Sequence, residues 1–263
     1  MRSPFARTLV ALALLALLAS AALAHAEVVQ SGRLRVEMLG QITPKTLPRD
    51  GAAPIAVEVG GRIETTDGSP PPQLQVLTVE LNREGRIDSG GLPLCPYEAL
   101  EPASTSRALA ACGQALVGRG SFEAQIALPG QPSSTAEGTL LAFNGRRGGR
   151  PVLFAHIYSP HPFPTSFVIV FSIKRLAAGR FGYALTAHLP AALGRWGRLT
   201  AIELRLDRRY SSGGERHSYL SAGCPAPSGF GSANFPLART SFGFPGGVTL
   251  RGTLTRVCHA RGR

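Results

Sequence analysis

The sequence predicts an all-β fold, either a large antiparallel β-sandwich or a strongly curved sheet, with one short helix at about residues 105–116. Many short segments alternate apolar and polar residues, which is the period of a half-buried strand. Turn-forming residues are frequent, with 31 glycines and 21 prolines among 263 residues. Only one stretch repeats apolar residues at helical spacing. Together these observations favour many short strands over long helices.

Residues 1–26 have the features of a secretory signal peptide. Arg2 and Arg7 precede an apolar run that ends near Leu23, and Ala24-His25-Ala26 follows as a small-x-small cleavage site. A retained membrane anchor is the alternative, because the run nearly reaches the ~18 to 20 residues of a spanning helix. We expect cleavage and export to the periplasm, cell envelope or exterior, with no membrane span in the remaining chain. Residues 27–263 then form a single all-β domain; two β domains dividing near residues 145–150 are the alternative.

The charge is strongly basic, with a formal net charge of +12 at pH 7 and 28 basic residues, of which all but Lys45 and Lys174 are arginine. Nucleic-acid-binding proteins gather such charge on one face and interleave aromatic residues with it. Here the arginines are scattered along an exported chain, so no nucleic-acid partner is predicted. The sign of the charge instead favours anionic envelope polymers or lipid head groups as partners.

The first strands are expected at residues 33–39, 54–64 and 74–82. In the second of these, Ile55, Val57 and Val59 lie on one side and Ala56 and Glu58 on the other. A polyproline stretch at residues 69–72 is interpreted as a stiff connector between the second and third.

The predicted helix at residues 105–116 can be capped by Ser104 or Thr105 and is followed by Gly118. Leu109, Cys112 and Leu116 recur at helical spacing, which places Cys112 on the apolar face. A bridge to this cysteine would hold the helix against the sheet.

Four cysteines in an exported chain predict two disulfides. Of the three possible pairings we expect the sequential one, Cys95 with Cys112 and Cys224 with Cys258. Zinc binding is the alternative, but the chain has no CxxC pair and its spacings fit no zinc site. No metal and no cofactor are therefore predicted.

The densest basic cluster follows a short apolar strand at residues 138–143, which ends in the hairpin signal Asn144-Gly145. In the loop after it, Arg146, Arg147 and Arg150 surround two glycines. Guanidinium groups and glycine amides can hold a phosphate or carboxylate. The alternative is a solvated hairpin tip.

Residues 151–159 and 165–173 are predicted to form the centre of the core. Residues 167–171 are apolar in both phases, so this strand is expected to be covered on both faces. Tyr158 and His161 lie in the proline-rich loop between the two strands, which could pre-order them for a ligand or serve only as a connector. The single tryptophan, Trp196, lies in a predicted turn, where it could stack on a sugar or shield the end of the core.

The segment of residues 201–210 alternates with Ile202 and Leu204 facing in. Glu203 and Asp207 share the outer face with arginines between them. This arrangement is typical of cross-strand ion pairs on a solvated face rather than of a glycosidase acid pair, which needs an apolar pocket around one carboxyl group.

The last third is predicted to form a terminal β-layer, in which residues 218–225 are answered by residues 249–258 and both cysteines point to the buried side. These segments, together with residues 235–239 and 140–145, resemble a family of uncharacterised exported bacterial proteins. No activity, ligand or site is known for that family, so the resemblance implies no particular function.

Catalytic motifs are missing from the sequence: it contains no G-x-S-x-G, no H-E-x-x-H, no P-loop and no dinucleotide fingerprint. We therefore predict no catalytic residue. The leading hypothesis is a non-enzymatic binding or scaffolding protein of the cell envelope or exterior. A carrier of a lipid or other apolar ligand is the alternative, suggested by the doubly apolar strand, and an unrecognised hydrolase is the second alternative.

Overall fold

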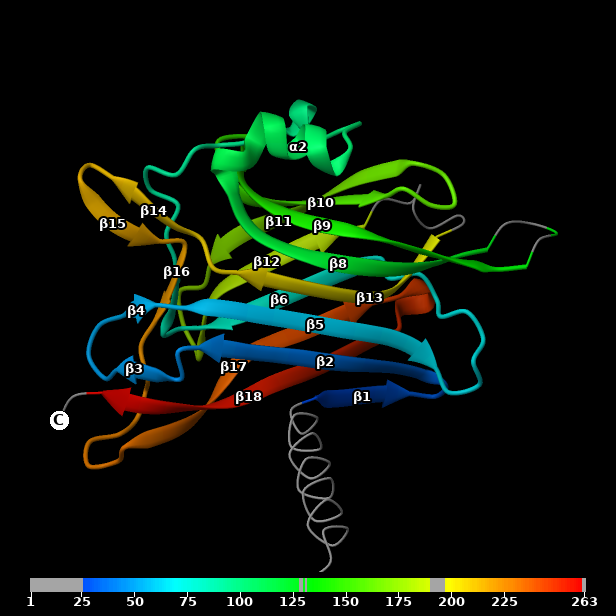
Figure 1. Cartoon of the computed structure of the whole chain (residues 1–263). Coiled ribbons are helices and arrows are strands. Elements are labelled where there is room, and N and C mark those ends of the chain that lie inside the picture. The colour runs from blue at the N-terminus through cyan, green and yellow to red at the C-terminus, as the bar shows by residue number, and fades with distance from the viewer. Residues whose placement is uncertain (1–25, 128–129, 131, 190–196, 262–263) are drawn as a thin grey trace, which may run out of the picture.

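The computed structural model describes residues 26–127, 130, 132–189 and 197–261. Nearly all of the predicted signal peptide, and Trp196, lie outside the described residues. In the described ranges most of the regular structure is strand, with one short α-helix, which confirms the predicted all-β class. The strands form a large curled sheet, the second of the two predicted architectures (Figure 1).

The large sheet has 13 strands in the order β1-β2-β5-β13-β8-β9-β10-β11-β12-β6-β17-β18-β3. Its strands are β1 (Glu27–Ser31), β2 (Leu34–Thr43), β3 (Thr46–Pro48), β5 (Ala56–Thr65), β6 (Val76–Asn82), β8 (Leu116–Ile126), β9 (Ser134–Arg147), β10 (Arg150–Ser159), β11 (Thr165–Arg175), β12 (Phe181–His188), β13 (Gly197–Leu206), β17 (Ser232–Gly243) and β18 (Thr249–Arg261). Neighbours run antiparallel except for the short β18–β3 pair, which is parallel.

Two small sheets lie beside the large one. One consists of β4 (Ala53–Pro54), β16 (Leu220–Ala222) and β7 (Gly85–Ile87), and the other of β14 (Arg209–Ser212) and β15 (Glu215–Ser218). The three-stranded sheet packs its β16 residues against the interior of the large sheet, since Leu220 and Ala222 belong to the main hydrophobic cluster.

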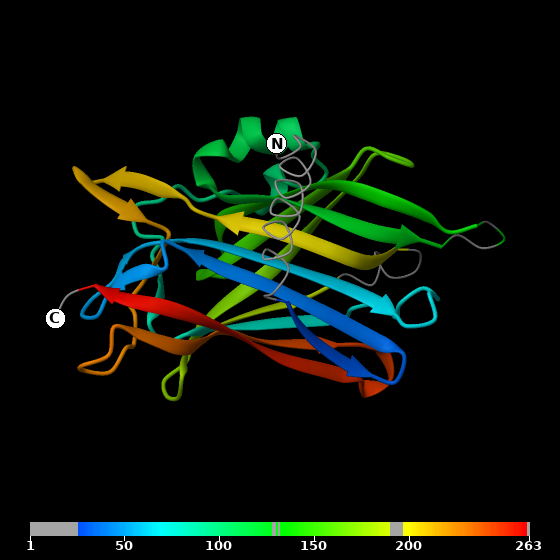
Figure 2. The same cartoon turned by 60° about the horizontal axis from the view of Figure 1, so that its bottom comes forward.

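The sheet curls until its C-terminal strand β18 lies beside β1 and β2 (Figure 2). We call this junction the seam. In the described part of the chain, β18 has no β-ladder with β1 or β2, and side chains make the connection instead. Glu27 of β1 pairs with Arg256 of β18, whose Nε donates to the Gly40 carbonyl oxygen of β2.

Period-2 alternation produces the apolar interior, because successive side chains of a strand point to opposite faces. In β2, Leu34, Val36 and Met38 are buried while Arg35 and Glu37 between them are only partly covered. The strand at residues 167–171 is covered on both faces, as predicted. Ile169 packs inside the curled sheet, whereas Val168 packs on the outside, beneath the helix region.

The helix α2 (Thr105–Cys112) begins where the sequence predicts, with the Ser104 hydroxyl accepting a hydrogen bond from the Arg107 amide. It ends at Cys112 rather than near residue 116, so the predicted C-terminal boundary is wrong. The chain tightens into a 3₁₀ turn over Gly113–Ala115, because Leu116 already pairs with Phe143 as the first residue of β8. The helix covers the outer face of β9 to β11 (Figure 1).

Both predicted disulfides are present. The Cα atoms are 5.3 Å apart in Cys95–Cys112 and 5.8 Å apart in Cys224–Cys258, within the range that a disulfide spans. The expected terminal layer is different, however. Residues 220–222 pair with β4 and β7, whereas β18 pairs with β17 and β3, so Cys224–Cys258 joins two sheets rather than two neighbouring strands.

The Asn144-Gly145 hairpin prediction is wrong, because both residues lie inside β9. The chain turns at Gly148 and Gly149, whose φ angles of 54° and 74° suit a two-residue hairpin. Asn144 is buried, and its side-chain amide donates to the carbonyl oxygens of Leu92 and Pro93. Gly145 lies under the Phe154 ring, where a Cβ would be 2.2 Å from the ring. The alternative domain boundary near residues 145–150 falls in this hairpin.

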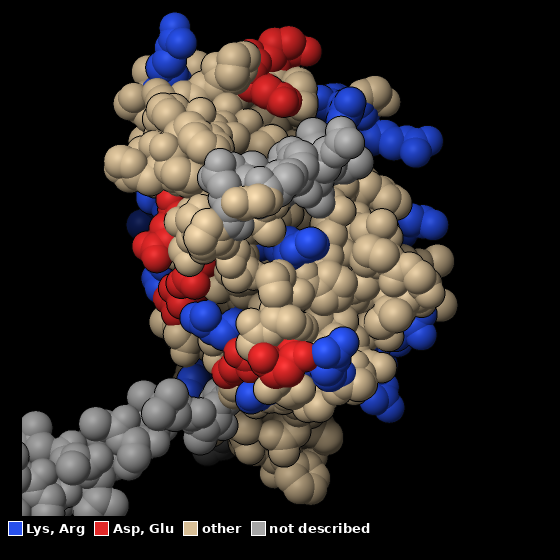
Figure 3. Space-filling view, turned by 90° about the vertical axis from the view of Figure 1, so that its right-hand side faces the viewer, with Lys and Arg blue, Asp and Glu red and all other residues tan. Residues whose placement is uncertain are grey.

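Charged side chains of the outer face pair across strands, as predicted for residues 201–210. Arg205 of β13 contacts Glu58 of β5, and Arg62 contacts Glu123. Acidic and basic groups likewise lie beside one another on the end of the molecule shown in Figure 3. Across the described ranges, no helix is long and apolar enough to span a membrane.

His156 of β10 is fully buried beneath the loop that leads into α2, where its Nε2 lies 2.9 Å from the Ala103 carbonyl oxygen. A carbonyl oxygen only accepts, so Nε2 carries the proton and the neutral ring leaves Nδ1 bare. Nδ1 is buried without a hydrogen-bond partner in the described structure. Burial therefore lowers the pKa of His156, since a second proton would be placed at an unsolvated position.

We expect His156 to make the fold sensitive to mild acid. In the unfolded chain the imidazole binds a proton with a pKa of about 6.5, whereas in the folded chain burial lowers the pKa of His156. The neutral His156 therefore contributes fully to the free energy of unfolding above this pH, and this contribution is lost as the pH falls below it. Urea titrations between pH 7.5 and pH 5 should show a shallower loss of unfolding free energy for His156→Gln than for the wild type. The exposed His161→Gln is the control; a His156→Gln profile that matches it would contradict the prediction.

Candidate functional site

The curled sheet encloses an apolar cavity of about 170 Å³. The cavity is lined by inward-facing aliphatic and aromatic side chains, which come mainly from β5, β6, β10 to β13 and β17. Its lining includes Val57, Val59, Leu77, Val79, Leu81, Leu153, Ala155, Ile157, Ile169, Phe171, Leu185, Ile202, Leu204 and Leu237. Protein cores rarely contain voids larger than a water molecule, so this space is unusual for a packed interior.

A second cavity of about 90 Å³ lies next to the first. Val59, Leu74 and Leu77 line both spaces. Thr240 brings a hydroxyl group to the smaller one, and this hydroxyl is 2.8 Å from Met38 Sδ. The interior thus holds two adjoining apolar spaces.

The main cavity also has a few polar residues in its lining. The Asn82 side chain is satisfied, because it donates to the Pro236 carbonyl oxygen and accepts from the Glu84 amide. Tyr219 is only 2% exposed, and its hydroxyl is buried without a hydrogen-bond partner among the residues described. Burial raises the pKa of Tyr219 far above its ordinary value, so the hydroxyl keeps its proton.

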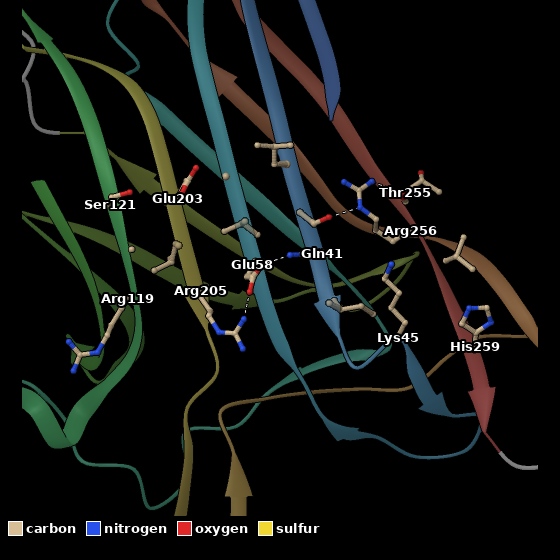
Figure 4. Close-up of a pocket in the computed structure, with 18 residues that line it drawn as sticks. Gln41, Lys45, Glu58, Arg119, Ser121, Glu203, Arg205, Thr255, Arg256 and His259 are labelled. Atoms are coloured by element: carbon tan, nitrogen blue, oxygen red, sulfur yellow. Dashed lines mark hydrogen bonds and ion pairs between the residues drawn. The ribbon is translucent and has the colours of Figure 1, made fainter. Parts of the chain in front are cut away.

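A groove of about 990 Å³ runs over the outer face of β8, β13, β5 and β2 to the seam (Figure 4). The exposed apolar side chains of Leu39 and Val257 lie in it. Arg205 and Gln41 both bond the Glu58 carboxylate in the groove. Most of its polar side chains are exposed or half-buried, as on a solvated sheet face, whereas Arg256 at the seam is buried.

The structure does not bring the sequence-predicted ligand residues together. Arg146, Arg147 and Arg150 are exposed at the tip of the β9–β10 hairpin, where the Arg147 guanidinium lies 5.4 Å from the centre of the Tyr97 ring. Tyr158 and His161 lie at the opposite end of the ten-residue strand β10, about 30 Å away at the rise of a β-strand.

These described residues line neither the apolar cavity nor the groove, and Trp196 lies outside the described residues. Ligand binding by them remains a prediction. Alternation correctly predicts that cavity-lining residues such as Val59 and Ile202 point to the interior. Alternation does not identify Tyr219 as an interior residue, because it precedes the inward-facing Leu220 and would point to the other face of a regular strand.

No protein-family model matches the chain, and neither the curated proteins nor the solved structures contain a significant match. Across the residues that the structure describes, no three His, Cys, Asp or Glu side chains are grouped so that they could hold a metal ion.

Proposed function

We propose that this protein is an exported binding protein that carries a small apolar molecule inside its curled sheet. The observation that supports the proposal is the apolar cavity of about 170 Å³. The two disulfides are typical of proteins in oxidising compartments, which is consistent with export.

An empty cavity of this size is costly for a folded protein. At roughly 24 cal/mol per Å³, leaving it unfilled costs about 4 kcal/mol. Typical domains are stable by only about 5 to 15 kcal/mol, so this is a large share of the total. Lengthening a few lining side chains by one or two carbons would remove the cost. The retained space therefore supports a role for an occupant.

The volume limits the size of the ligand. A dry apolar cavity of roughly 150 Å³ binds benzene in an engineered protein, whereas drug-sized ligands need roughly 300 Å³ or more. The cavity therefore suits a molecule of about one ring or a short branched chain, with the adjoining 90 Å³ space available for a substituent. A two-chain lipid is too large for it.

The outer groove offers less support for a function. Its arginines at positions 205 and 256 are engaged by Glu58 and Glu27, so an anionic polymer would have to compete with pairs already formed. Binding of anionic envelope polymers or lipid head groups, as expected from the net charge, thus remains a prediction without a defined site. The unrecognised hydrolase also remains a prediction without a defined site, and Asp207 of the acid pair considered above is engaged by Arg205 at 2.8 Å.

We expect Ala155→Leu to weaken the binding of an apolar ligand. Ala155 lines the cavity and is 4% exposed, so three added carbons would occupy part of the ligand's volume. In isothermal titration with methylenecyclohexane as the probe, the affinity should fall by at least about ten-fold. The ligand-free variant should unfold at a higher temperature, because the cavity is partly filled.

The matched control is Ala184→Leu, which adds the same carbons to the outer face of β12, two strands away from β10 in the same sheet. This variant should bind the probe like the wild type. Native mass spectrometry of protein purified from its own host should also show a co-purifying small mass. A wild-type protein that binds no apolar probe and carries no such mass would overturn the proposed function.

A further inference from the structure

We propose that the loop of residues 225–231, which joins β16 to β17, docks the protein on an anionic lipid bilayer. We call it the anchor loop. It places the Phe230 ring at the boundary between head groups and acyl chains, while basic side chains beside the loop face the head groups. This inference goes beyond the carrier function and does not depend on it, because it concerns the surface of the molecule and not the cavity.

Phe230 is the most exposed large apolar side chain among the described residues, at 64%. The anchor loop extends from the same end of the molecule as β3 and the end of β18 (Figures 1 and 2). Pro225 and Pro227 of this loop are exposed as well. A single exposed apolar residue is ordinary on a protein surface, so the meaning of this ring depends on how it is held and on the charges beside it.

The backbone of the anchor loop is well fixed. The Arg49 guanidinium donates to three of its carbonyl oxygens, those of Ala226, Pro227 and Phe230. The disulfide of Cys224 fixes the start of the loop, and at its end the Gly231 carbonyl oxygen accepts from the Ala260 amide. Because the backbone is already ordered, insertion of the ring into a lipid surface costs little additional conformational entropy.

Positive charge gathers on the two segments next to the anchor loop. Backbone hydrogen bonds join the region of β3 to the end of β18, and the end of β18 to the loop. These segments, residues 43–51 and 259–261, carry Lys45, Arg49 and Arg261 against the single acidic residue Asp50. The carbonyl groups that Arg49 bonds are neutral, so they do not cancel its charge. Among the described residues, Lys45 and Arg261 form no ion pair.

An exposed aromatic ring beside a local excess of positive charge matches an anionic bilayer. Each Lys or Arg near such a surface adds to the attraction, and an apolar ring is stabilised at the boundary of the acyl chains. A protein partner is a poorer match, because specific protein interfaces cover roughly 800 Å² on each side. The anchor loop presents one large apolar side chain and no such surface.

The test measures binding to phosphatidylcholine vesicles, with and without phosphatidylglycerol, by co-sedimentation of protein purified from its own host. The wild type should bind the vesicles that contain phosphatidylglycerol, and more weakly as the salt concentration rises. Phe230→Ala should weaken this binding by about ten-fold, because it removes most of the apolar surface that enters the bilayer. Phe163→Ala is the matched control and should bind like the wild type. Phe163 is 53% exposed, but its loop, residues 160–164, contains no lysine or arginine.

Two pairs of charge replacements test the basic residues. Lys45→Gln combined with Arg261→Gln should weaken binding to the anionic vesicles by at least about ten-fold. Arg107→Gln combined with Arg216→Gln removes the same charge from exposed positions on α2 and β15 and should have a much smaller effect. All of the replaced side chains are exposed, so every variant should melt close to the wild-type temperature.

Several results would overturn the proposal. Equal binding of Phe230→Ala and the wild type would show that the ring does not enter the bilayer, and an equal loss in Phe163→Ala would show that the anchor loop is not special. A wild type that binds neither kind of vesicle would also contradict it. If gel filtration shows a wild-type dimer that Phe230→Ala dissociates, the loop is a contact between two copies of the chain and the lipid proposal is wrong. None of these results bears on the cavity, so the carrier function is tested separately.

Discussion

Replacing both Cys224 and Cys258 by alanine is expected to lower the free energy of unfolding by about 4 kcal/mol. The bridge closes a loop between cysteines 34 positions apart, and opening it releases the corresponding chain entropy in the unfolded state. Both cysteines are fully buried, so the lost sulfur atoms also leave unfilled space. The midpoint and slope of urea unfolding measure the change.

The structure gives a reason for a large effect at this bridge. Cys224 follows β16 of the three-stranded sheet, and its amide donates to the Pro48 carbonyl oxygen of β3, while Cys258 belongs to β18. The bridge thus connects the small sheet to the last strand near the seam. The double alanine variant of Cys95 and Cys112 is the comparison, with a smaller expected loss of about 3 kcal/mol for its 17-position separation. Loss of less than about 1 kcal/mol in the Cys224 and Cys258 variant would contradict the prediction.

Arg256→Met is expected to destabilise the fold by about 3 kcal/mol by opening the seam. Arg256 is 8% exposed, and its guanidinium contacts the Glu27 carboxylate at 2.6 and 3.2 Å. It also donates to the Gly40 carbonyl oxygen, so one side chain connects β18 to both β1 and β2. Removing it leaves the partly buried Glu27 carboxylate without this partner, and such a loss costs more than the pair itself contributes.

Arg239→Met provides the matched control for the seam. Arg239 also pairs with a carboxylate on a neighbouring strand, that of Glu80, but its side chain is 49% exposed. Its replacement should change the urea midpoint little. Adding Glu27→Gln to Arg256→Met should recover part of the lost stability, because the unpaired charge is then absent. Equal effects of the two arginine replacements would show that the seam does not depend on Arg256.

The local features of the sequence predicted much of the fold. Alternation located most strands and their inward faces, as in Val57 and Val59 of β5 and in Ile202 and Leu204 of β13, because it depends only on which side of a strand meets water. Ser104 was one of two proposed caps for the helix, and the structure uses its hydroxyl. An even number of cysteines behind a predicted signal peptide indicates two disulfides, although the sequence does not force the choice among three pairings.

Other features depend on contacts between distant segments. Asn144-Gly145 is a strong hairpin signal locally, yet here the buried Asn144 amide bonds two carbonyl groups about 50 positions earlier, and β9 continues past it. Residues 220–222 alternate like a strand of the main sheet but pair with β4 and β7. In both cases the strand partner, and not the local sequence, decides the outcome.

The sequence by itself determined the all-β class, the inward face of most strands and the capped start of the helix, since each follows from neighbouring residues and solvent exposure. Only the tertiary structure decided that the sheet curls, that within the described ranges side chains rather than a ladder join its ends, and that the enclosed core leaves about 170 Å³ unfilled. The physical reason is that alternation defines only the face of the sheet on which each side chain lies. The distance between opposite walls of the curled sheet depends on strand order and curvature across the whole chain.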